Sequence, residues 1–342
     1  MRIGVAGCGY WGPKHVRVLE SINEVDQVVV IDPDESARKA ITQSYPRVLE
    51  YADLSSALPE IDALVVATPP RKHAQLAFEA LDAGKHILVE KPFTTSSDDA
   101  RELIRTARDS DLVLMVGHTF EYNPVVWRLR DAVNSGELGD VHYIDTARLN
   151  LGLYQPDVNV VWDLAPHDIS ILNYVLQARP TSVEARGYSC AGSKYQDVAY
   201  ISIEYADIQA EANVHVSWLD PCKVRRVTVV GSEKMAVYND VSADEKLRIY
   251  DKGVAFDSDG QGQDAPAVPL SYRYGSIVSP FIDFREPLRV EDEHFVDCIK
   301  TGARPSTDGE NGLAVVEVLE AAEQSMLAGF EHGMKLTAGA GS

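Results

Sequence analysis

Short apolar runs without polar interruptions recur along the first third of the chain. They are rich in β-branched residues, as expected for strands that are covered on both faces of a parallel sheet. The predicted strands are Arg2–Ala6, Gln27–Ile31 and residues 64–67, 86–89 and 112–116. Between them, apolar residues recur with helical spacing, as in Ala74, Ala77, Phe78 and Leu81. Alternating strands and helices predict a doubly wound α/β domain over residues 1–120.

The pattern changes after residue 120. Asn123-Pro124 has the composition of a helix start, and Gly136 stands where that helix should end. Residues 208–218 then alternate, with Ile208, Ala210, Ala212, Val214, Val216 and Trp218 on one face. Further strands are predicted at residues 197–205, 224–230 and 247–250, and two helices close the chain. Short connections between alternating strands predict an α+β domain with a large, mostly antiparallel open sheet over residues 121–335.

One face of residues 208–218 is apolar over its whole length, and an apolar face of this size is rarely left in water. We therefore expect a second copy of the chain to cover it, in a homodimer or homotetramer. Residues 257–267 are rich in Gly, Asp and Gln and predict a surface loop. Residues 336–342 predict a disordered tail.

The composition narrows the class of protein and its partners. Of the 342 residues, 45% are hydrophobic and 25% charged, which is ordinary for a globular protein. The formal net charge of −20 argues against nucleic-acid and membrane partners, because phosphates and anionic lipids are repelled. No secretory signal and no run of roughly 20 apolar residues is present. The four cysteines are scattered, which predicts a cytoplasmic protein without a cysteine-built metal site.

The turn after the first predicted strand carries the pattern G-x-G-x-x-G in Gly7, Gly9 and Gly12. The first glycine permits a tight turn, the second lets a pyrophosphate approach the backbone, and the third lets the next helix pack closely. Asp32 ends the second strand, 20 residues after Gly12, where a carboxylate binds ribose hydroxyls and repels a 2′-phosphate. These residues predict a dinucleotide site that prefers NAD to NADP. The alternative is a packing turn, with Asp32 as a turn residue before Pro33.

Two further clusters suit proton and hydride chemistry. Glu90-Lys91-Pro92 ends the strand at 86–89, at the edge where open α/β sheets bind ligands. Asp163 and His167 are four residues apart and share a helix face, with Asp163 as a possible N-cap. A carboxylate and an imidazole so placed suit a general base with an orienting or proton-relaying acid. Further zinc ligands are not evident, so no metal is expected. Taken alone, each cluster can also be a solvated lysine or a capped helix with a surface histidine.

In this order the motifs resemble the glucose–fructose oxidoreductase, inositol dehydrogenase and rhizopine catabolism protein (Gfo/Idh/MocA) family of NAD(P)-dependent oxidoreductases. The matching elements are the glycine motif, Ala67-Thr68-Pro69-x-x-x-His73, Glu90-Lys91-Pro92, Asn123-Pro124, Asp163-x-x-x-His167, and Arg304-Pro305 followed by Asp308-Gly309. The resemblance covers about residues 1–330. It implies an N-terminal Rossmann domain, a C-terminal domain with a large open sheet, and oligomers formed through that sheet.

The resemblance also implies roles for single residues. Lys91 is expected to contact the reacting oxygen, and Asp163 and His167 to be the paired catalytic positions, with His167 as the base. The implied cofactor-binding residues are Gly7, Gly9, Tyr10, Trp11, Gly12, Asp32, Thr68, Pro69, His73, Glu90 and Lys91. Ala165 and Ser170 depart from the family pattern, which has Gly and Asp at these places in many relatives, whereas here an Asp follows His167 directly.

The leading interpretation is an NAD-dependent dehydrogenase that oxidises C3 of a nucleotide-linked sugar, such as UDP-N-acetylglucosamine or its uronic acid, to a 3-keto sugar ready for transamination. Arg128, Arg148 and residues 223–226 are the candidate cations for the diphosphate. The alternatives are an inositol or free-sugar dehydrogenase, a 3-keto sugar reductase, and a glycosidase that uses NAD transiently. A regulatory NAD-binding protein is a further alternative, against which Lys91, Asp163 and His167 together argue.

Overall fold

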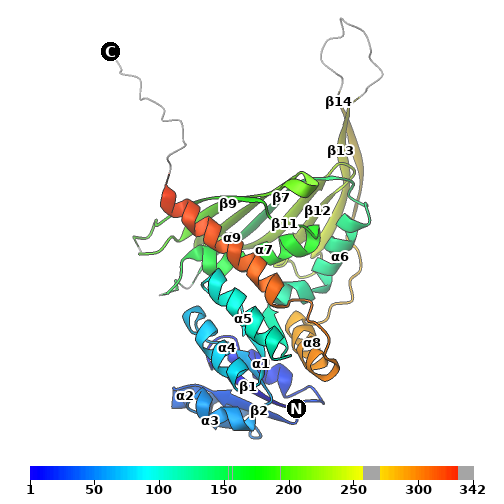
Figure 1. The fold of residues 1–342 in the computed structure, drawn as a ribbon. Helices are drawn as coiled ribbons and strands as arrows, with labels where there is room; N and C mark the ends of the chain where they lie inside the picture. Colours follow the sequence, from blue (N-terminus) through cyan, green and yellow to red (C-terminus); the bar gives the residue numbers. More distant parts are fainter. Residues whose placement is uncertain (153, 156, 193, 257–269, 330–342) are drawn as a thin grey trace, which may run out of the picture.

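The computed structural model describes residues 1–152, 154–155, 157–192, 194–256 and 270–329. Figure 1 shows an α/β unit that holds the N-terminus and, beside it, a broad second sheet whose helices face that unit. Within the described residues, no helix is both long and apolar enough to cross a membrane. The loop predicted at 257–267 and the tail predicted at 336–342 lie outside the described residues.

The N-terminal unit is built on a parallel sheet, as its unbroken apolar runs predict. In the described part of the chain this sheet has six strands in the order β3-β2-β1-β4-β5-β6. The strands are β1 (Arg2–Ala6), β2 (Gln27–Ile31), β3 (Leu49–Tyr51), β4 (Ala63–Val66), β5 (His86–Glu90) and β6 (Leu114–Gly117). The helices are α1 (Gly12–Leu19), α2 (Glu35–Ser44), α3 (Leu54–Ala57), α4 (His73–Asp82) and α5 (Ser97–Asp109), with 3-10 turns η1 (Leu58–Glu60), η2 (Pro70–Lys72) and η3 (Thr119–Tyr122). The carboxyl ends of the parallel strands meet at one edge, where ligands bind in such sheets.

The predicted doubly wound domain is confirmed, with β3 as an addition. This strand lies at the edge of the sheet, and its side chains are exposed or half-buried. It therefore lacks the run of buried apolar residues by which the other strands were predicted.

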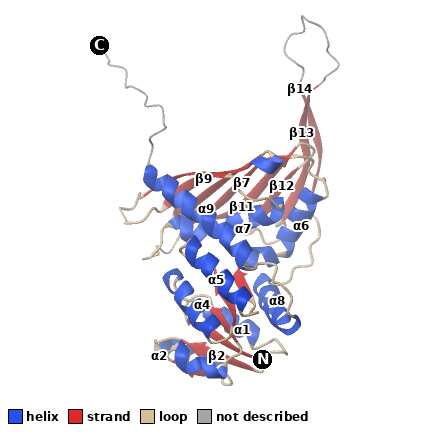
Figure 2. Ribbon diagram, viewed as in Figure 1, coloured by secondary structure: helices blue, strands red, loops and turns tan. Residues whose placement is uncertain are grey.

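The second unit is a mixed sheet whose described strands number eight, in the order β14-β13-β12-β11-β7-β10-β9-β8. The strands are β7 (Val141–Leu151), β8 (Ser182–Tyr188), β9 (Val198–Tyr205), β10 (Ala210–Ser217), β11 (Leu219–Gly231), β12 (Met235–Asn239), β13 (Leu247–Phe256) and β14 (Leu270–Val278). The remaining elements are α6 (Pro124–Asn134), α7 (Val160–Leu176), η4 (Ala206–Ile208), α8 (Pro287–Thr301) and α9 (Gly309–Ala328). Figure 2 shows the helices gathered on one side of the sheet. Among the described strand pairs, β7 with β10 is parallel and the others are antiparallel, which confirms the predicted α+β unit.

No strand is predicted over residues 141–151, yet β7 lies near the middle of the sheet, between β11 and β10. Its buried positions are Ile144, Thr146 and Arg148. Two of these three are polar, so the alternation of apolar and polar residues that marks a strand is not visible in the sequence.

The prediction that a second copy of the chain covers the apolar face of residues 208–218 assumed that this face is exposed, and that assumption is wrong. Ala212 and Val214 of β10 are buried within the chain, in the core that includes Ile169 of α7. The side chains on the opposite face of β10, such as Glu211 and Asn213, are the exposed ones. The apolar face is therefore covered by the chain's own helices, and oligomerisation stays a prediction that needs another surface.

The closing segment returns to the first unit. Leu288, Phe295 and Val296 of α8 share a hydrophobic core with Val16 and Leu19 of α1. The boundary predicted at residue 120 falls inside η3 and stays a prediction. The spatial consequence is that α8 brings buried side chains next to the ends of β5 and β6.

Candidate active site

The glycine motif forms the turn between β1 and α1. Gly7 has a φ of 97°, and a Cβ added there would lie 2.5 Å from the carbonyl oxygen of Ala67. A Cβ on Gly12 would collide with the carbonyl oxygen of Gly7, so both positions exclude side chains. A Cβ on Gly9 would meet nothing within 4 Å, which leaves open space above the turn. The turn thus combines a tight backbone with room for a phosphate at a helix start.

Asp32 lies just beyond β2 and faces this turn. Its carboxylate accepts hydrogen bonds from the backbone N–H groups of Cys8 and Asp34, both at 2.8 Å. Each oxygen keeps a further lone pair, which is what recognition of two ribose hydroxyls requires.

The other residues expected at the cofactor divide into two groups. Tyr10 and Trp11 line the glycine turn, and the ammonium of Lys14 lies 3.0 Å and 4.3 Å from their ring centroids. His73 is buried, with its ring nitrogens 2.8 Å from the carbonyl oxygens of Thr68 and Pro92. Its ring is therefore occupied in joining the segments that follow β4 and β5, and the geometry favours a supporting role for it.

Lys91 follows β5 and reaches across to α7. Its Nζ donates to the backbone oxygen of Asp163 at 2.7 Å and lies 3.5 Å from the Oδ1 atom of the same residue. The indole Nε1 of Trp218 donates to the other oxygen, Oδ2, at 2.9 Å. Asp163 lies in the first turn of α7 and is not its cap, because the helix begins earlier and Asn159 caps it. The carboxylate of Asp163 therefore holds the lysine and is not the orienting partner of His167 that the sequence predicts.

His167 lies one turn further along α7. Its ring contacts Phe120 edge-on, with centroids 5.1 Å apart. Burial, followed by the positive charges of Lys91 and Arg148, holds the pKa of the imidazole well below its ordinary value. The side chain is therefore neutral at neutral pH, the state in which it can accept a proton.

A buried network that the sequence did not predict anchors the end of β5. His15 of α1 places Nε2 3.1 Å from Glu90 Oε1 and Nδ1 2.9 Å from Asp292 Oδ1. Burial opposes charge on this imidazole, but the two carboxylates raise the pKa of His15 well above its ordinary value. Glu90 thus bonds His15 of α1, and through it is connected to Asp292 of α8, which makes it an anchor behind Lys91.

Arg148 was a candidate cation for a diphosphate, and that prediction is wrong. Its guanidinium makes a bidentate pair with Asp168, with Nε–Oδ2 at 2.7 Å and a second contact at 3.1 Å. Both side chains are buried, and the guanidinium lies over the Phe120 ring at 4.7 Å. Arg128 is likewise paired, with Glu137 at 2.6 Å.

Residues 223–226 in the middle of β11 remain as candidate cations. Lys14 lowers the pKa of Tyr10, and Arg225 and Lys223 lower it further, so these two cations lie within electrostatic reach of the glycine turn. Arg225 also contributes to the low pKa of His167. The positive charges of Lys223 and Arg225 therefore favour negative charge at the glycine turn. The charge of Arg225 also helps to keep His167 neutral.

Comparison with known proteins places this site in a family. Residues 1–118 match the NAD-binding Rossmann fold of the Gfo/Idh/MocA oxidoreductases, and residues 126–237 match the C-terminal domain of the same family. The chain belongs to the Gfo/Idh/MocA family. Its members bind NAD through this fold, and NAD is the cofactor of this oxidoreductase.

Two curated relatives span nearly the whole chain. UDP-N-acetylglucosamine 3-dehydrogenase of Acidithiobacillus ferrooxidans is 28% identical over 92% of this chain and 94% of its own length. Inositol 2-dehydrogenase of Rhizobium meliloti is 24% identical over 95% and 97%. Among solved structures, the first of these enzymes, GnnA, superposes with a TM-score of 0.76 at 26% identity over 96% of this chain and 98% of its own. GenD2 from gentamicin A biosynthesis, in complex with NAD, has a TM-score of 0.78 at 26% identity over 96% and 94%.

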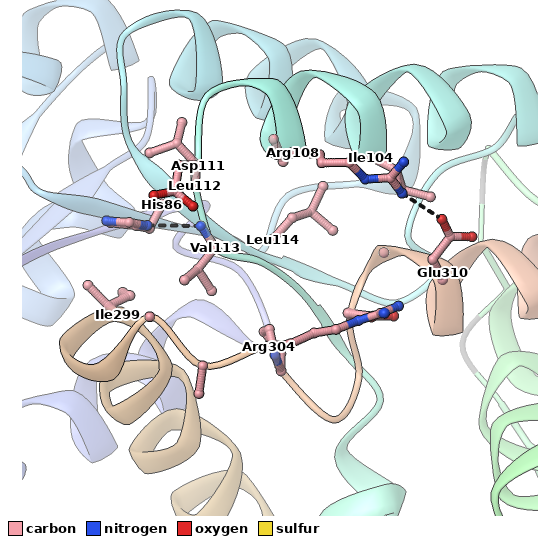
Figure 3. A pocket seen from close by; sticks show the side chains of 16 residues that line it. His86, Ile104, Arg108, Asp111, Leu112, Val113, Leu114, Ile299, Arg304 and Glu310 are labelled. Atoms are coloured by element: carbon pink, nitrogen blue, oxygen red, sulfur yellow. Dashed lines mark hydrogen bonds and ion pairs between the residues drawn. The ribbon is translucent and has the colours of Figure 1, made fainter.

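This family member also has a cavity of about 530 Å³ away from the glycine turn and Lys91, shown in Figure 3. It lies near His86 at the start of β5, the end of the strand opposite to Lys91. The guanidinium of Arg108 is paired with Glu310 at 3.0 Å, and Arg304 is paired with Asp308. Both arginines of the cavity are therefore paired within the chain, and its position separates it from the predicted site.

Proposed function

We propose that this oxidoreductase oxidises the C3 hydroxyl of a UDP-linked N-acetylamino sugar, UDP-N-acetylglucosamine or its uronic acid, with NAD as hydride acceptor. The proposal assigns proton removal to His167, whose neutral imidazole accepts the hydroxyl proton at Nε2. It assigns stabilisation of the developing negative charge on the oxygen to Lys91. Bound NAD supplies the redox chemistry by accepting the hydride from the same carbon.

The contacts of Lys91 support this assignment. An ammonium has three N–H donors, and Asp163 takes up the two directed toward α7. One donor is left for a substrate oxygen. Because Asp163 is itself fixed by Trp218, the lysine is held in place before substrate binds, which lowers the cost of orienting it.

Lys223 and Arg225 of β11 are the residues that favour a nucleotide-linked sugar as the substrate. Lys223 is exposed and makes no ion pair with another described residue, and Arg225 is only partly neutralised by Asp240 at 3.3 Å. In a chain with a net charge of −20, such cations within electrostatic reach of the glycine turn favour an anionic substrate group. The similarity to a UDP-N-acetylglucosamine 3-dehydrogenase supports the same choice.

The test is NADH formation with UDP-N-acetylglucosamine, its uronic acid, free N-acetylglucosamine and inositols, followed by identification of the oxidised carbon. We expect turnover with a UDP-sugar and a KM at least about 10-fold higher for Lys223→Gln, since one charged hydrogen bond contributes about 1.5–3 kcal/mol. The exposed cation Arg105 on α5, changed to Gln, is the matched control. Turnover of the free sugar with equal efficiency would contradict the nucleotide requirement.

The second candidate is an inositol or free-sugar dehydrogenase. It is favoured by the neutralisation of Arg128 and Arg148, which removes two of the cations that a diphosphate could have used. Robust turnover of an inositol with none of the UDP-sugars would establish it.

A further inference from the structure

His118 is a histidine with no assigned role that lies directly after β6. Its side chain is 1% exposed, and among the described residues neither ring nitrogen has a hydrogen-bond partner. Buried polar atoms in proteins are nearly always hydrogen-bonded, because leaving one unpaired costs free energy. An unpaired imidazole at the ligand-binding edge of the sheet therefore calls for a functional explanation.

The strand register places His118 beside Lys91. Glu90 and Gly117 are partners at the ends of β5 and β6, so Lys91 and His118 each directly follow one of two paired strand ends. A Cβ on Gly117 would lie 3.1 Å from the Cα of Glu90, so the two strand ends are closely packed. The charges of Glu90 and Lys91 both act on the pKa of His118.

One ring nitrogen of His167 also lacks a hydrogen-bond partner among the described residues. This atom, Nδ1, is buried. Phe120, two residues after His118, has its ring centroid 5.1 Å from that of His167. Burial lowers the pKa of His167 most, followed by the charges of Lys91, Arg148, Arg225 and His118. Lysine and arginine only donate hydrogen bonds, so within this set only the imidazole of His118 can accept one from His167.

The carboxylates of α7 are committed elsewhere. Asp163 accepts from Lys91 and Trp218, and Asp168 accepts both hydrogen bonds of its pair from Arg148. Neither is hydrogen-bonded to His167. The base that the proposed function requires thus lacks the carboxylate that commonly orients a catalytic histidine.

We propose that His118 is the positioning residue for His167, and that the Nδ1–H of His167 donates to a water molecule that in turn donates to a ring nitrogen of His118. This bond holds His167 in the tautomer whose Nε2 carries a free lone pair for the substrate proton. The acceptor must be a neutral imidazole, because an imidazolium has no lone pair. Burial lowers the pKa of His118 to about 4, which keeps it neutral at neutral pH.

The inference rests on the proposed role of His167, and the first measurement addresses the pairing without depending on turnover. In ¹⁵N NMR of the enzyme labelled at histidine, we expect His167 with a protonated Nδ1 and an unprotonated Nε2 at neutral pH. Its signals are identified by their loss in His167→Gln. In His118→Leu the same residue should show a mixture of tautomers. A wild-type His167 protonated at Nε2, or an unchanged tautomer in His118→Leu, would overturn the proposal.

The kinetic measurement separates positioning from ligand binding. His118→Leu should lower kcat about 10- to 100-fold, the loss expected for one hydrogen bond to a group that becomes charged. The affinity for NAD should stay unchanged in a fluorescence titration. His118→Asn and His118→Gln restore an acceptor near one or other ring nitrogen, and one of them should recover most of kcat. His142→Leu, at an exposed histidine of β7, is the control.

The outcomes distinguish the two proposals. Weakened NAD binding with a normal kcat in His118→Leu would mean that His118 contacts the cofactor, and the positioning role would be refuted. Full turnover in His167→Gln would instead refute the role of His167 as the base, while the tautomer measurement would still decide whether the two imidazoles are paired. The proposed function itself fails only if no UDP-sugar is oxidised.

Discussion

The buried pair of Arg148 and Asp168 offers the strongest test of how the site is supported. Both side chains are nearly inaccessible, at 5% and 1% exposure, and two hydrogen bonds of 2.7 and 3.1 Å join them. Asp168→Asn keeps the size of the side chain and removes its charge, which leaves a guanidinium buried without a counter-charge. Breaking a buried pair in this way costs about 3–5 kcal/mol of unfolding free energy.

Two comparisons make this expectation specific to the buried charge. Replacing both partners, as in Arg148→Met with Asp168→Leu, removes the unpaired charge and should destabilise less than the single change does. Glu102→Gln breaks the exposed pair with Arg105, whose side chains are 56% and 68% exposed, and should cost less than about 1 kcal/mol.

Urea unfolding followed by tryptophan fluorescence measures these differences. Asp168→Asn should also lower turnover, because the guanidinium lies over Phe120 and Phe120 contacts His167. An Asp168→Asn protein within about 1 kcal/mol of wild type would refute the reasoning. A double variant at least as unstable as the single one would refute it equally.

Four further predictions concern the site and the assembly of the chain. Asp32→Ala should weaken the preference for NAD over NADP, since it removes repulsion of a 2′-phosphate; equal use of both cofactors by the unmodified enzyme would contradict this. Lys91→Ala and His167→Ala should each lower kcat at least about 100-fold, and near-normal turnover in either would remove that residue from the mechanism. The low pKa of His167 should keep kcat/KM on its plateau below pH 6.5, and Lys91→Ala should move the acid limb to higher pH, because a positive charge that lowers this pKa is lost. Sedimentation should show a homodimer or homotetramer, and a 37.6 kDa monomer at micromolar concentration would contradict this.

The sequence predicts those strands and helices whose buried positions are occupied by apolar residues. The β1 and β5 strands are covered on both faces, so each reads as an apolar run. The β7 strand escaped prediction because Thr146 and Arg148 occupy its buried positions. Arg148 is buried there because Asp168 neutralises it, and that partner comes from a helix that follows the strand in the chain. The residues of the strand alone therefore do not indicate that Arg148 has such a partner.

The same limit applies to the candidate site. The glycine turn and Asp32 are close in sequence, and their arrangement follows from one strand–helix–strand unit. His15 and Asp292, by contrast, are 277 positions apart and meet only because α8 returns to pack on α1. His118 had no visible partner for the same reason, since its neighbours lie at the end of β5 and on α7. The signal available in the sequence was the position of two isolated histidines. His118 follows a predicted strand, and His15 comes shortly after the glycine motif.

The buried cations of the site are paired with carboxylates, whereas the exposed Lys223 is not paired within the described part of the chain. Arg148 is fully neutralised by Asp168, Lys91 is shared with Asp163, and Lys223 has no ion partner among the described residues. A charge that is already paired contributes to structure, whereas an unpaired one is free to attract an anion. The overall charge of −20 therefore does not decide against an anionic substrate, because an unpaired cation such as Lys223 can attract an anion locally. On this reasoning the proposed nucleotide-linked substrate would be selected by Lys223 and Arg225 of β11 and not by the buried Arg148.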